Sequence, residues 1–205
     1  MEIGSKIARP LLEETLVELH ETGALTLVGE RIRVSPDQRM RIAELAIALG
    51  SDPEKVARQL RWQEFETFAE HVLTQNQYAT TAHFIFKCAT RRFEIDVLGS
   101  REPMVLCIDC KHWHQGWFPS RIMSAAKNQL LRVESLSHVF GRHEERLRTI
   151  GWKSVRLLPV VLALADPSSK FVDGVPIVSA LRLRTFLSEI NPWLDSLRFV
   201  DARTI

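Results

Sequence analysis

The sequence contains few cysteines, little net charge and no long hydrophobic run. Three of its 205 residues are cysteine, and this small, odd number argues against a disulfide scaffold and for a reducing interior. The longest apolar run, LLPVVLALA from Leu157, is far shorter than the roughly 20 residues of a membrane helix. The acidic, amphipathic start lacks the apolar core of a signal peptide. These absences predict a soluble cytoplasmic protein with no membrane span.

The charge balance and the absence of a phosphate-binding loop restrict the partners. The formal net charge is +2, so a nucleic-acid surface requires a local concentration of Arg and Lys. No GxxxxGK[ST] loop occurs, and no nucleotide cofactor is therefore expected. With 45% hydrophobic and 25% charged residues the chain has an ordinary globular composition. Its length suits one compact domain with a small appendage.

Residues 1–59 differ in pattern from the remainder. Leucines between Leu11 and Leu19 recur at helical spacing and Gly23 is a suitable stop, while Gly29 and Glu30 mark the turn of a short basic hairpin. Such a helix and hairpin are typical of a winged-helix-like module that holds DNA. A helical bundle with a solvated surface hairpin explains the same pattern equally well. We expect helices over residues 9–23, 36–50 and 51–60, and a hairpin over 24–35.

Residues 60–205 show the alternation of helices and strands that is typical of an α/β domain. The first helix places Phe65, Phe68, Ala69, Val72 and Leu73 on one stripe, with Glu66 at the edge of that stripe. A mostly apolar mixed sheet flanked by helices is expected. The expected strands are Ala82–Ala89, Phe93–Leu98, Met104–Lys111, Val155–Asp166 and Val175–Ala180, and the expected later helices are Ser120–Phe140 and Leu181–Ile190.

Two consecutive predicted strands each carry an aspartate inside an apolar run. Asp109 and Lys111 share one face of their strand because side chains alternate, and antiparallel pairing brings Asp96 beside Asp109. Glu66 supplies a third carboxylate from the helix that packs on the sheet. Carboxylates gathered at one point require a compensating cation, and oxygen ligands suit Mg²⁺ or Mn²⁺. A divalent ion and a nearby lysine are the equipment for phosphodiester hydrolysis.

In this order and spacing, Phe65-Glu66, Ile95-Asp96 and Asp109-Cys110-Lys111 resemble the motifs of the PD-(D/E)XK nuclease superfamily. The likeness is closer to Mrr-type restriction endonucleases and archaeal Holliday-junction resolvases, and it covers roughly Leu60 to Trp193. It implies a restriction-endonuclease-like fold and a metal-dependent DNA endonuclease of repair, recombination or restriction. Isoleucine stands in place of the family's proline, and Asp109 in place of its more frequent glutamate. Carried over, the motifs make Glu66, Asp96 and Asp109 metal ligands, Cys110 a ligand through its backbone carbonyl, and Lys111 the catalytic lysine.

Ordinary alternatives exist for the same residues. Asp109 and Lys111 suit an ion pair on a solvent-facing strand edge, and Asp96 suits a turn cap. Cys107, Cys110, His112 and His114 also resemble a tight zinc cluster. Cys107 and Cys110 would face opposite ways in a strand, however, which disfavours zinc.

Candidate nucleic-acid contacts surround the motif. Arg91 and Arg92 lie at a predicted hairpin tip, and the helix after the lysine strand carries Lys127 and Gln129. The loop with His112, His114 and Trp117 suits stacking on unpaired bases or packing on the core. Solvation or core packing accounts for each of these side chains as well.

The sequence leaves three functional hypotheses. The first is the nuclease, with DNA as its substrate. A homodimer is compatible with it, because cutting both strands usually takes two active sites, but the sequence shows no interface. The second is a catalytically silent DNA-binding or scaffolding protein on the same fold. The third is a transcriptional regulator that depends on the N-terminal module.

Overall fold

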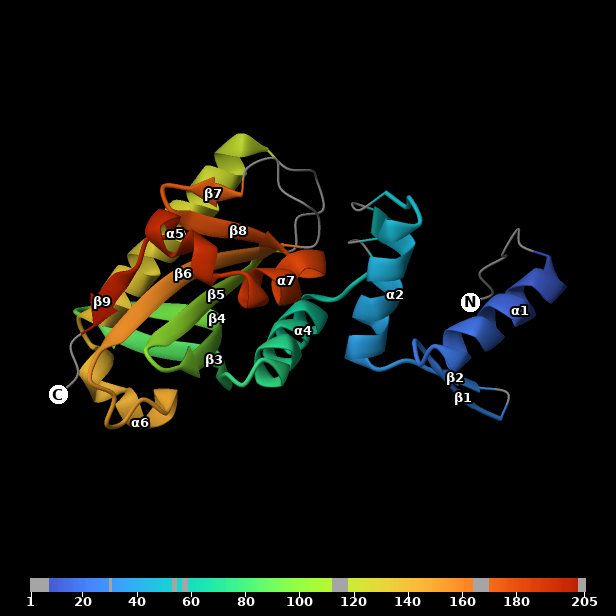
Figure 1. Cartoon of the computed structure of the whole chain (residues 1–205), viewed down its shortest axis with the longest axis horizontal. Coiled ribbons are helices and arrows are strands. Elements are labelled where there is room, and N and C mark those ends of the chain that lie inside the picture. Colours follow the sequence, from blue (N-terminus) through green and yellow to red (C-terminus); the bar gives the residue numbers. More distant parts are fainter. Residues whose placement is uncertain are drawn as a thin grey trace.

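A computed structural model describes residues 8–29, 31–52, 55–56, 59–111, 118–163 and 170–202. Its centre is a seven-stranded mixed sheet in the order β3-β4-β5-β6-β8-β7, with β9 paired to β6 (Figure 1). Strands β3, β4 and β5 are antiparallel, whereas β5, β6 and β8 are parallel. The strands are β3 Ala79–Cys88, β4 Arg91–Arg101, β5 Met104–Lys111, β6 Val155–Ala163, β7 Phe171–Val172, β8 Val175–Ser179 and β9 Val200–Ala202.

Helices cover both faces of this sheet, which confirms the predicted α/β class. On one face, α4 (Trp62–Gln75) and α7 (Leu183–Ser188) pack on Leu106, Ile108 and Cys110 of β5. On the other face, α5 (Pro119–Ser137) packs on residues that include Val105 and Cys107. The shorter helical segments are η1 Phe140–Arg142, α6 Glu144–Leu147, η2 Ala180–Arg182 and η3 Asn191–Ser196.

Helix α4 buries the apolar stripe expected from the sequence. Phe65, Ala69, Val72 and Leu73 are at most 1% exposed. A Cβ added at Gly99 of β4 would lie 2.9 Å from a methyl carbon of Leu73, so glycine permits this close approach of helix and sheet. The stripe therefore anchors α4 directly beside the strands that carry the motif.

The hairpin between β4 and β5 is tighter than predicted. The expected strands, which end at Leu98 and begin at Met104, leave the five residues GSREP between them, but Ser100 pairs with Val105 and Arg101 pairs with Met104. Only Glu102 and Pro103 form the turn. The pairing of β4 with β5 continues through Ser100 and Arg101 because the two strands are already in register from Val97 onward.

The N-terminal segment contains α1 (Arg9–Glu21), β1 (Thr26–Val28), β2 (Arg31–Arg33) and α2 (Pro36–Ala48). Gly23, at φ +72°, follows the end of α1 as predicted. No described residue of α1 is buried, and α1 and the hairpin lie farthest from the sheet (Figure 1). Helix α2 contributes Met40 and Ala43 to the same core as α4. Residues 53, 54, 57 and 58 of the expected third helix lie outside the described residues, and the winged-helix interpretation stays a prediction.

Candidate functional site

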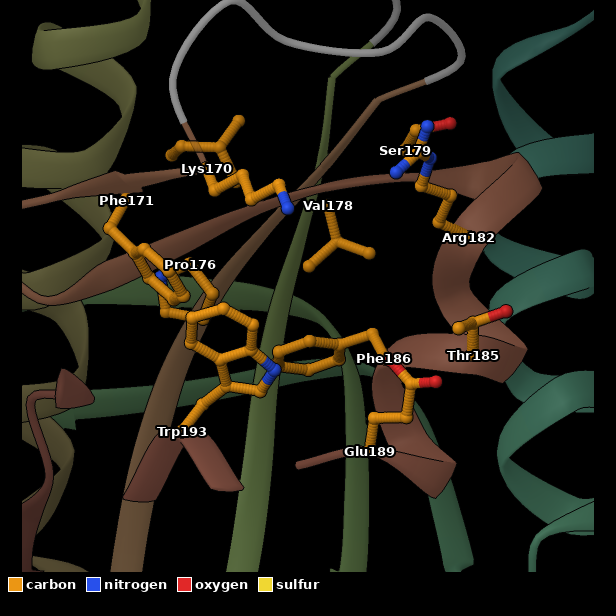
Figure 2. A pocket seen from close by; sticks show the side chains of 11 residues that line it. Lys170, Phe171, Pro176, Val178, Ser179, Arg182, Thr185, Phe186, Glu189 and Trp193 are labelled. Carbon is orange, nitrogen blue, oxygen red and sulfur yellow. The ribbon is translucent and has the colours of Figure 1, made fainter. Parts of the chain in front are cut away.

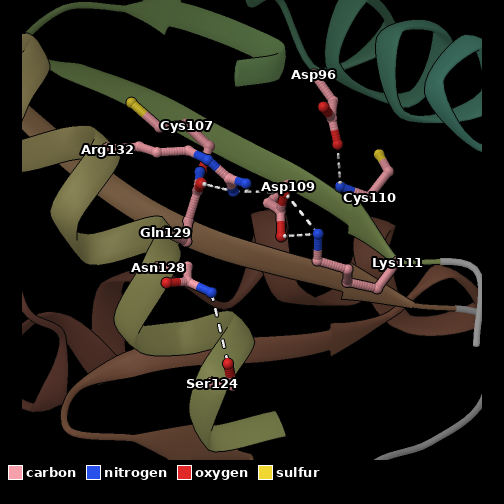
Figure 3. Close-up of polar contacts among 9 residues, drawn as sticks. All are labelled: Asp96, Cys107, Asp109, Cys110, Lys111, Ser124, Asn128, Gln129 and Arg132. Carbon is pink, nitrogen blue, oxygen red and sulfur yellow. Dashed lines mark hydrogen bonds and ion pairs between the residues drawn. The ribbon is translucent and has the colours of Figure 1, made fainter. Parts of the chain in front are cut away.

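Asp109 is buried between β5 and α5 and is paired with two cations. The carboxylate is 2% exposed. Lys111 Nζ donates to Oδ1 at 3.0 Å and lies 2.8 Å from Oδ2, while Arg132 Nη1 of α5 donates to Oδ1 at 2.7 Å (Figure 3). The side chains of Lys111 and Arg132 are 24% and 28% exposed. The predicted sharing of a face by Asp109 and Lys111 is therefore observed as direct contact.

This ion pair is not the surface pair of the ordinary alternative. Strand β5 lies between β4 and β6 in the sheet, so Asp109 is on an interior strand. Burial of a carboxylate costs several kcal/mol unless charge and hydrogen bonds compensate it. Lys111 and Arg132 supply that compensation.

Gln129 of α5 holds Arg132 in place. Its side chain is fully buried, its Nε2 donates to the carbonyl of Cys107 at 2.7 Å, and its Oε1 accepts from Arg132 Nη1 at 3.2 Å. Gln129 was predicted to contact nucleic acid, but it has no exposed surface from which to do so. It instead ties α5 to β5 and orients the guanidinium toward Asp109.

Asp96 lies on the other side of β5 (Figure 3). The backbone N–H of Cys110 donates to Asp96 Oδ2 at 2.7 Å, so the carboxylate bridges β4 and β5 rather than capping a turn. The pKa of Asp96 is raised to about 6, first by burial and then by the Asp109 and Glu66 carboxylates, while the Cys110 hydrogen bond and Lys111 act to lower it. Asp96 therefore lies in the field of both other predicted acids.

Glu66 and His83 extend this acidic side. Glu66 is 3% exposed on α4, and its Oε2 lies 3.4 Å from Nε2 of His83. Nδ1 of the same ring lies 3.7 Å from Oε1 of Glu94. His83 was not singled out from the sequence, where one histidine in a strand gives no signal of its neighbours.

The strands twist locally at His83 and Asp96. Phe84 and Ile95 pair and belong to the core under α5, whereas Ala82 pairs with Val97, which belongs to the core under α4. Simple alternation would put Ile95 and Val97 on one face. His83, at φ +47°, occupies the left-handed region that side chains other than glycine enter at a cost. This twist turns Asp96 toward Cys110 and away from Asp109.

The described residues contain no ready-made cluster of three acidic, histidine or cysteine side chains at metal-binding spacing. The donors still suit a hard cation, because Mg²⁺ keeps several waters and takes only one or two carboxylates. The pKa of Asp96 is raised mainly by burial and further by the Asp109 and Glu66 carboxylates. Carboxylate oxygens are the donor type that Mg²⁺ and Mn²⁺ prefer.

The zinc alternative is not supported by the two cysteines that it requires. Cys110 packs in the core under α4 and Cys107 in the core under α5, so they lie on opposite faces of β5. All three cysteines of the chain are free thiols. His112, His114 and Trp117 lie outside the described residues.

The remaining predicted contacts are exposed and away from the acids. Arg91 and Arg92 begin β4 and are exposed, with the guanidinium of Arg91 4.9 Å from the centroid of the Phe93 ring. Arg92 lies four residues from Asp96, about 13 Å along an extended strand. Lys127 is exposed on α5. These three residues are accessible to a ligand from solvent, but they do not cluster around Asp96.

Comparisons with known proteins give relatives but no activity. No family model matches the chain. A crystal structure of a protein of unknown function, AF1548, is similar at a TM-score of 0.34 and 17% identity, over 51% of this chain and 49% of that one. No described helix is both long and apolar enough for a bilayer crossing. An uncharacterized protein of Archaeoglobus fulgidus is 30% identical over 142 residues, which is 69% of this chain and the whole length of that protein. The chain therefore belongs to the same family as this Archaeoglobus fulgidus protein.

Proposed function

We propose that this protein is a metal-dependent DNA endonuclease that hydrolyses phosphodiester bonds. The observation that carries the proposal is that Asp96 of β4 and Asp109 and Lys111 of β5 all lie next to Cys110, with Asp96 and Asp109 on opposite sides of β5. The backbone N–H of Cys110 donates to Asp96 Oδ2 at 2.7 Å. Asp109 and Lys111, the residues before and after Cys110 in β5, contact each other. The motif likeness to PD-(D/E)XK nucleases gives this arrangement its chemical interpretation.

Asp96, Asp109 and the carbonyl of Cys110 would hold Mg²⁺ or Mn²⁺, with Glu66 as a further carboxylate. A divalent ion there would supply an activated water and neutralise charge on a phosphoryl oxygen. The amine of Lys111 would orient that water and stabilise the charge that develops on the phosphate. Arg132 and Lys111 share Asp109, and the partial exposure of both cations would let them contact a phosphate group.

The direct test is cleavage of plasmid DNA with Mg²⁺ or Mn²⁺. Replacement of Lys111 or Asp109 by Ala should lower the nicking rate at least about 100-fold, because each removes a group that acts on developing charge, while DNA binding stays largely intact. Lys153→Ala and Asp201→Ala are matched controls, since both residues are exposed and outside the site. Wild-type rates in the Lys111 or Asp109 variants would refute the nuclease.

One observation favours the silent DNA-binding alternative. Two cations already neutralise Asp109, and a neutralised carboxylate is a weaker metal ligand. A protein that binds DNA but cuts no DNA form with either metal would support this alternative. Retention of binding after loss of metal would be its second signature.

The same proposal includes DNA binding by the N-terminal segment. It also includes assembly as a homodimer and a location in the cytoplasm. Arg31 and Arg33 of β2 are exposed, which suits contact with phosphates. Deletion of the segment would remove the α2 residues that share the core of α4. Paired substitution of Arg31 and Arg33 by Gln is therefore the cleaner test, with weaker DNA binding as the expected result.

A further inference from the structure

A pocket of about 240 Å³ lies on the face of the sheet covered by α7, between β8 and η3 (Figure 2). None of its residues belongs to the site described above. Its size is slightly below the range of about 300–1,000 Å³ for small-molecule sites. It therefore has room for one flat ring system rather than for a large cofactor. Its apolar walls are formed by Phe171, Pro176, Ile177, Val178, Phe186 and Trp193.

Aromatic rings form one side of this pocket. The centroids of Phe171 and Trp193 are 5.5 Å apart with their planes at 43°. Trp193 is 37% exposed, and Phe186 lines the same pocket (Figure 2). Exposed indole and phenyl faces are the surfaces on which nucleobases stack, a contact worth about 1–3 kcal/mol per base.

Cations border the same rings. Lys170 points into the pocket (Figure 2), with its Nζ 5.7 Å from the centroid of a Trp193 ring. Arg182 lines the opposite side, close to Ser179 and Thr185. Glu189 is the acid of the lining, so the pocket combines two cations with one carboxylate. A ring system attached to an anionic backbone matches this charge better than an apolar molecule does.

The pocket is also close to the proposed site. Lys111 pairs with Ala163 of β6, and Ala163 pairs with Ser179 of β8. Two strand spacings separate Lys111 from Ser179, or about 10 Å. Both residues end their strands at the carboxyl edge of the parallel part of the sheet. One nucleic-acid strand that crosses this edge can contact both places.

We infer that this pocket binds one unpaired nucleobase of the DNA strand that the protein cuts. The base stacks on Trp193, and Lys170 and Arg182 contact the adjacent phosphates. The inference rests on the proposed function and adds a substrate class to it, namely DNA with an unpaired or extruded base next to the cleavage position.

The test measures DNA binding in a Lys111→Ala background, so that binding is read without cleavage. The probes are a short duplex with one unpaired fluorescent adenine analogue and the same duplex fully paired. Trp193→Ala should weaken binding of the unpaired probe about 5- to 100-fold, with little effect on the paired probe. Trp193→Phe should retain most of the affinity because it keeps a stacking face. Fluorescence quenching of the bound analogue should be strongest with Trp193, weaker in Trp193→Phe and weakest in Trp193→Ala.

A second variant covers the case in which Trp193→Ala fails to fold. Thr185 is exposed at the pocket, so Thr185→Trp fills the space without removing a packed side chain. Ser154→Trp is its matched control, an exposed hydroxyl residue away from the pocket. Loss of preference for the unpaired probe in Thr185→Trp, but not in Ser154→Trp, would support the inference.

The outcomes separate this inference from the proposed function. If both probes bind and the pocket variants change neither affinity nor quenching, the base pocket is refuted while the nuclease stands. If neither probe binds the parent protein, the proposed DNA function fails, and the base pocket fails with it.

Discussion

The two sides of strand β5 place acidic side chains in different surroundings. On the α5 side, Asp109 contacts both Lys111 and Arg132. On the α4 side, burial and the nearby Asp109 and Glu66 carboxylates raise the pKa of Asp96 to about 6, although its carboxylate accepts a hydrogen bond from the backbone of Cys110. The same residue type is therefore charge-compensated on one side and held at an energetic cost on the other. The comparison assigns Asp109 a stabilising ion pair that Asp96 lacks.

The largest expected effect is on the compensated side. Asp109→Asn keeps the shape of the side chain but leaves Lys111 and Arg132, which are 24% and 28% exposed, without their counter-charge. Breaking a buried pair costs about 3–5 kcal/mol, and the partial exposure favours the lower end, about 3 kcal/mol. Urea unfolding at neutral pH measures this loss. Asp201→Asn, at an exposed strand position, is the control, and equal stability of the two variants would show that the pair is solvated.

In contrast to Asp109→Asn, Asp96→Asn is expected to make the folded protein more stable. Because the pKa of Asp96 rises from 3.8 to about 6 on folding, the folded state binds its proton more tightly than the unfolded state does. The wild-type protein therefore loses stability relative to the variant as pH increases from about 4 to 6. Each pKa unit is worth about 1.4 kcal/mol, and residual solvent contact brings the expected gain of Asp96→Asn to about 2 kcal/mol at pH 8.

Thermal unfolding with a chelator at pH 4 and pH 8 measures this gain, and the two proteins should converge at the lower pH. Addition of Mg²⁺ should then stabilise the wild type and not the variant, because only a ligand bound to the folded state adds stability. A gain that is independent of pH would disprove the electrostatic origin. A wild type that does not respond to Mg²⁺ would count against the metal site itself.

Arg132 tests whether the compensated side competes with a metal. Arg132→Met removes one cation from Asp109 but keeps an apolar stem, so affinity for Mg²⁺ should increase about 3- to 10-fold, or roughly 1 kcal/mol. Calorimetric titration measures the affinity. Lys127→Met removes an exposed cation from the same helix and should change little. A fall in affinity for Arg132→Met would show that Asp109 is not a ligand.

Patterns of burial and strand alternation were predictable because they depend on neighbours in the sequence. The stripe of α4 and the shared face of Asp109 and Lys111 follow from helical and strand periodicity. Arg132 was also within reach, since it lies three residues after Gln129 and therefore on the same helix face. That spacing was the signal that sequence reasoning missed.

Other features depended on contacts between distant segments. The extension of β4 to Arg101 required its partner strand, and the short strands β7 and β9 carry too few residues for a periodic signal. The reversal of faces at Asp96 required the backbone of His83 on the neighbouring strand. Simple alternation placed Asp96 beside Asp109, and it did not predict the turn of Asp96 toward Cys110.

The smallest expected effect concerns His83, whose backbone shapes the α4 side. At φ +47° glycine is favoured over alanine, so His83→Gly should be about 0.5–1 kcal/mol more stable than His83→Ala. Both variants lose the ring near Glu66, and this shared loss cancels in the difference. Ala89→Gly, at a turn residue with φ +52°, measures the stability that glycine adds at a positive φ where no acid is involved. Equal unfolding free energies for the two His83 variants, despite a gain at Ala89, would mean that the twist beside Asp96 stores no backbone strain.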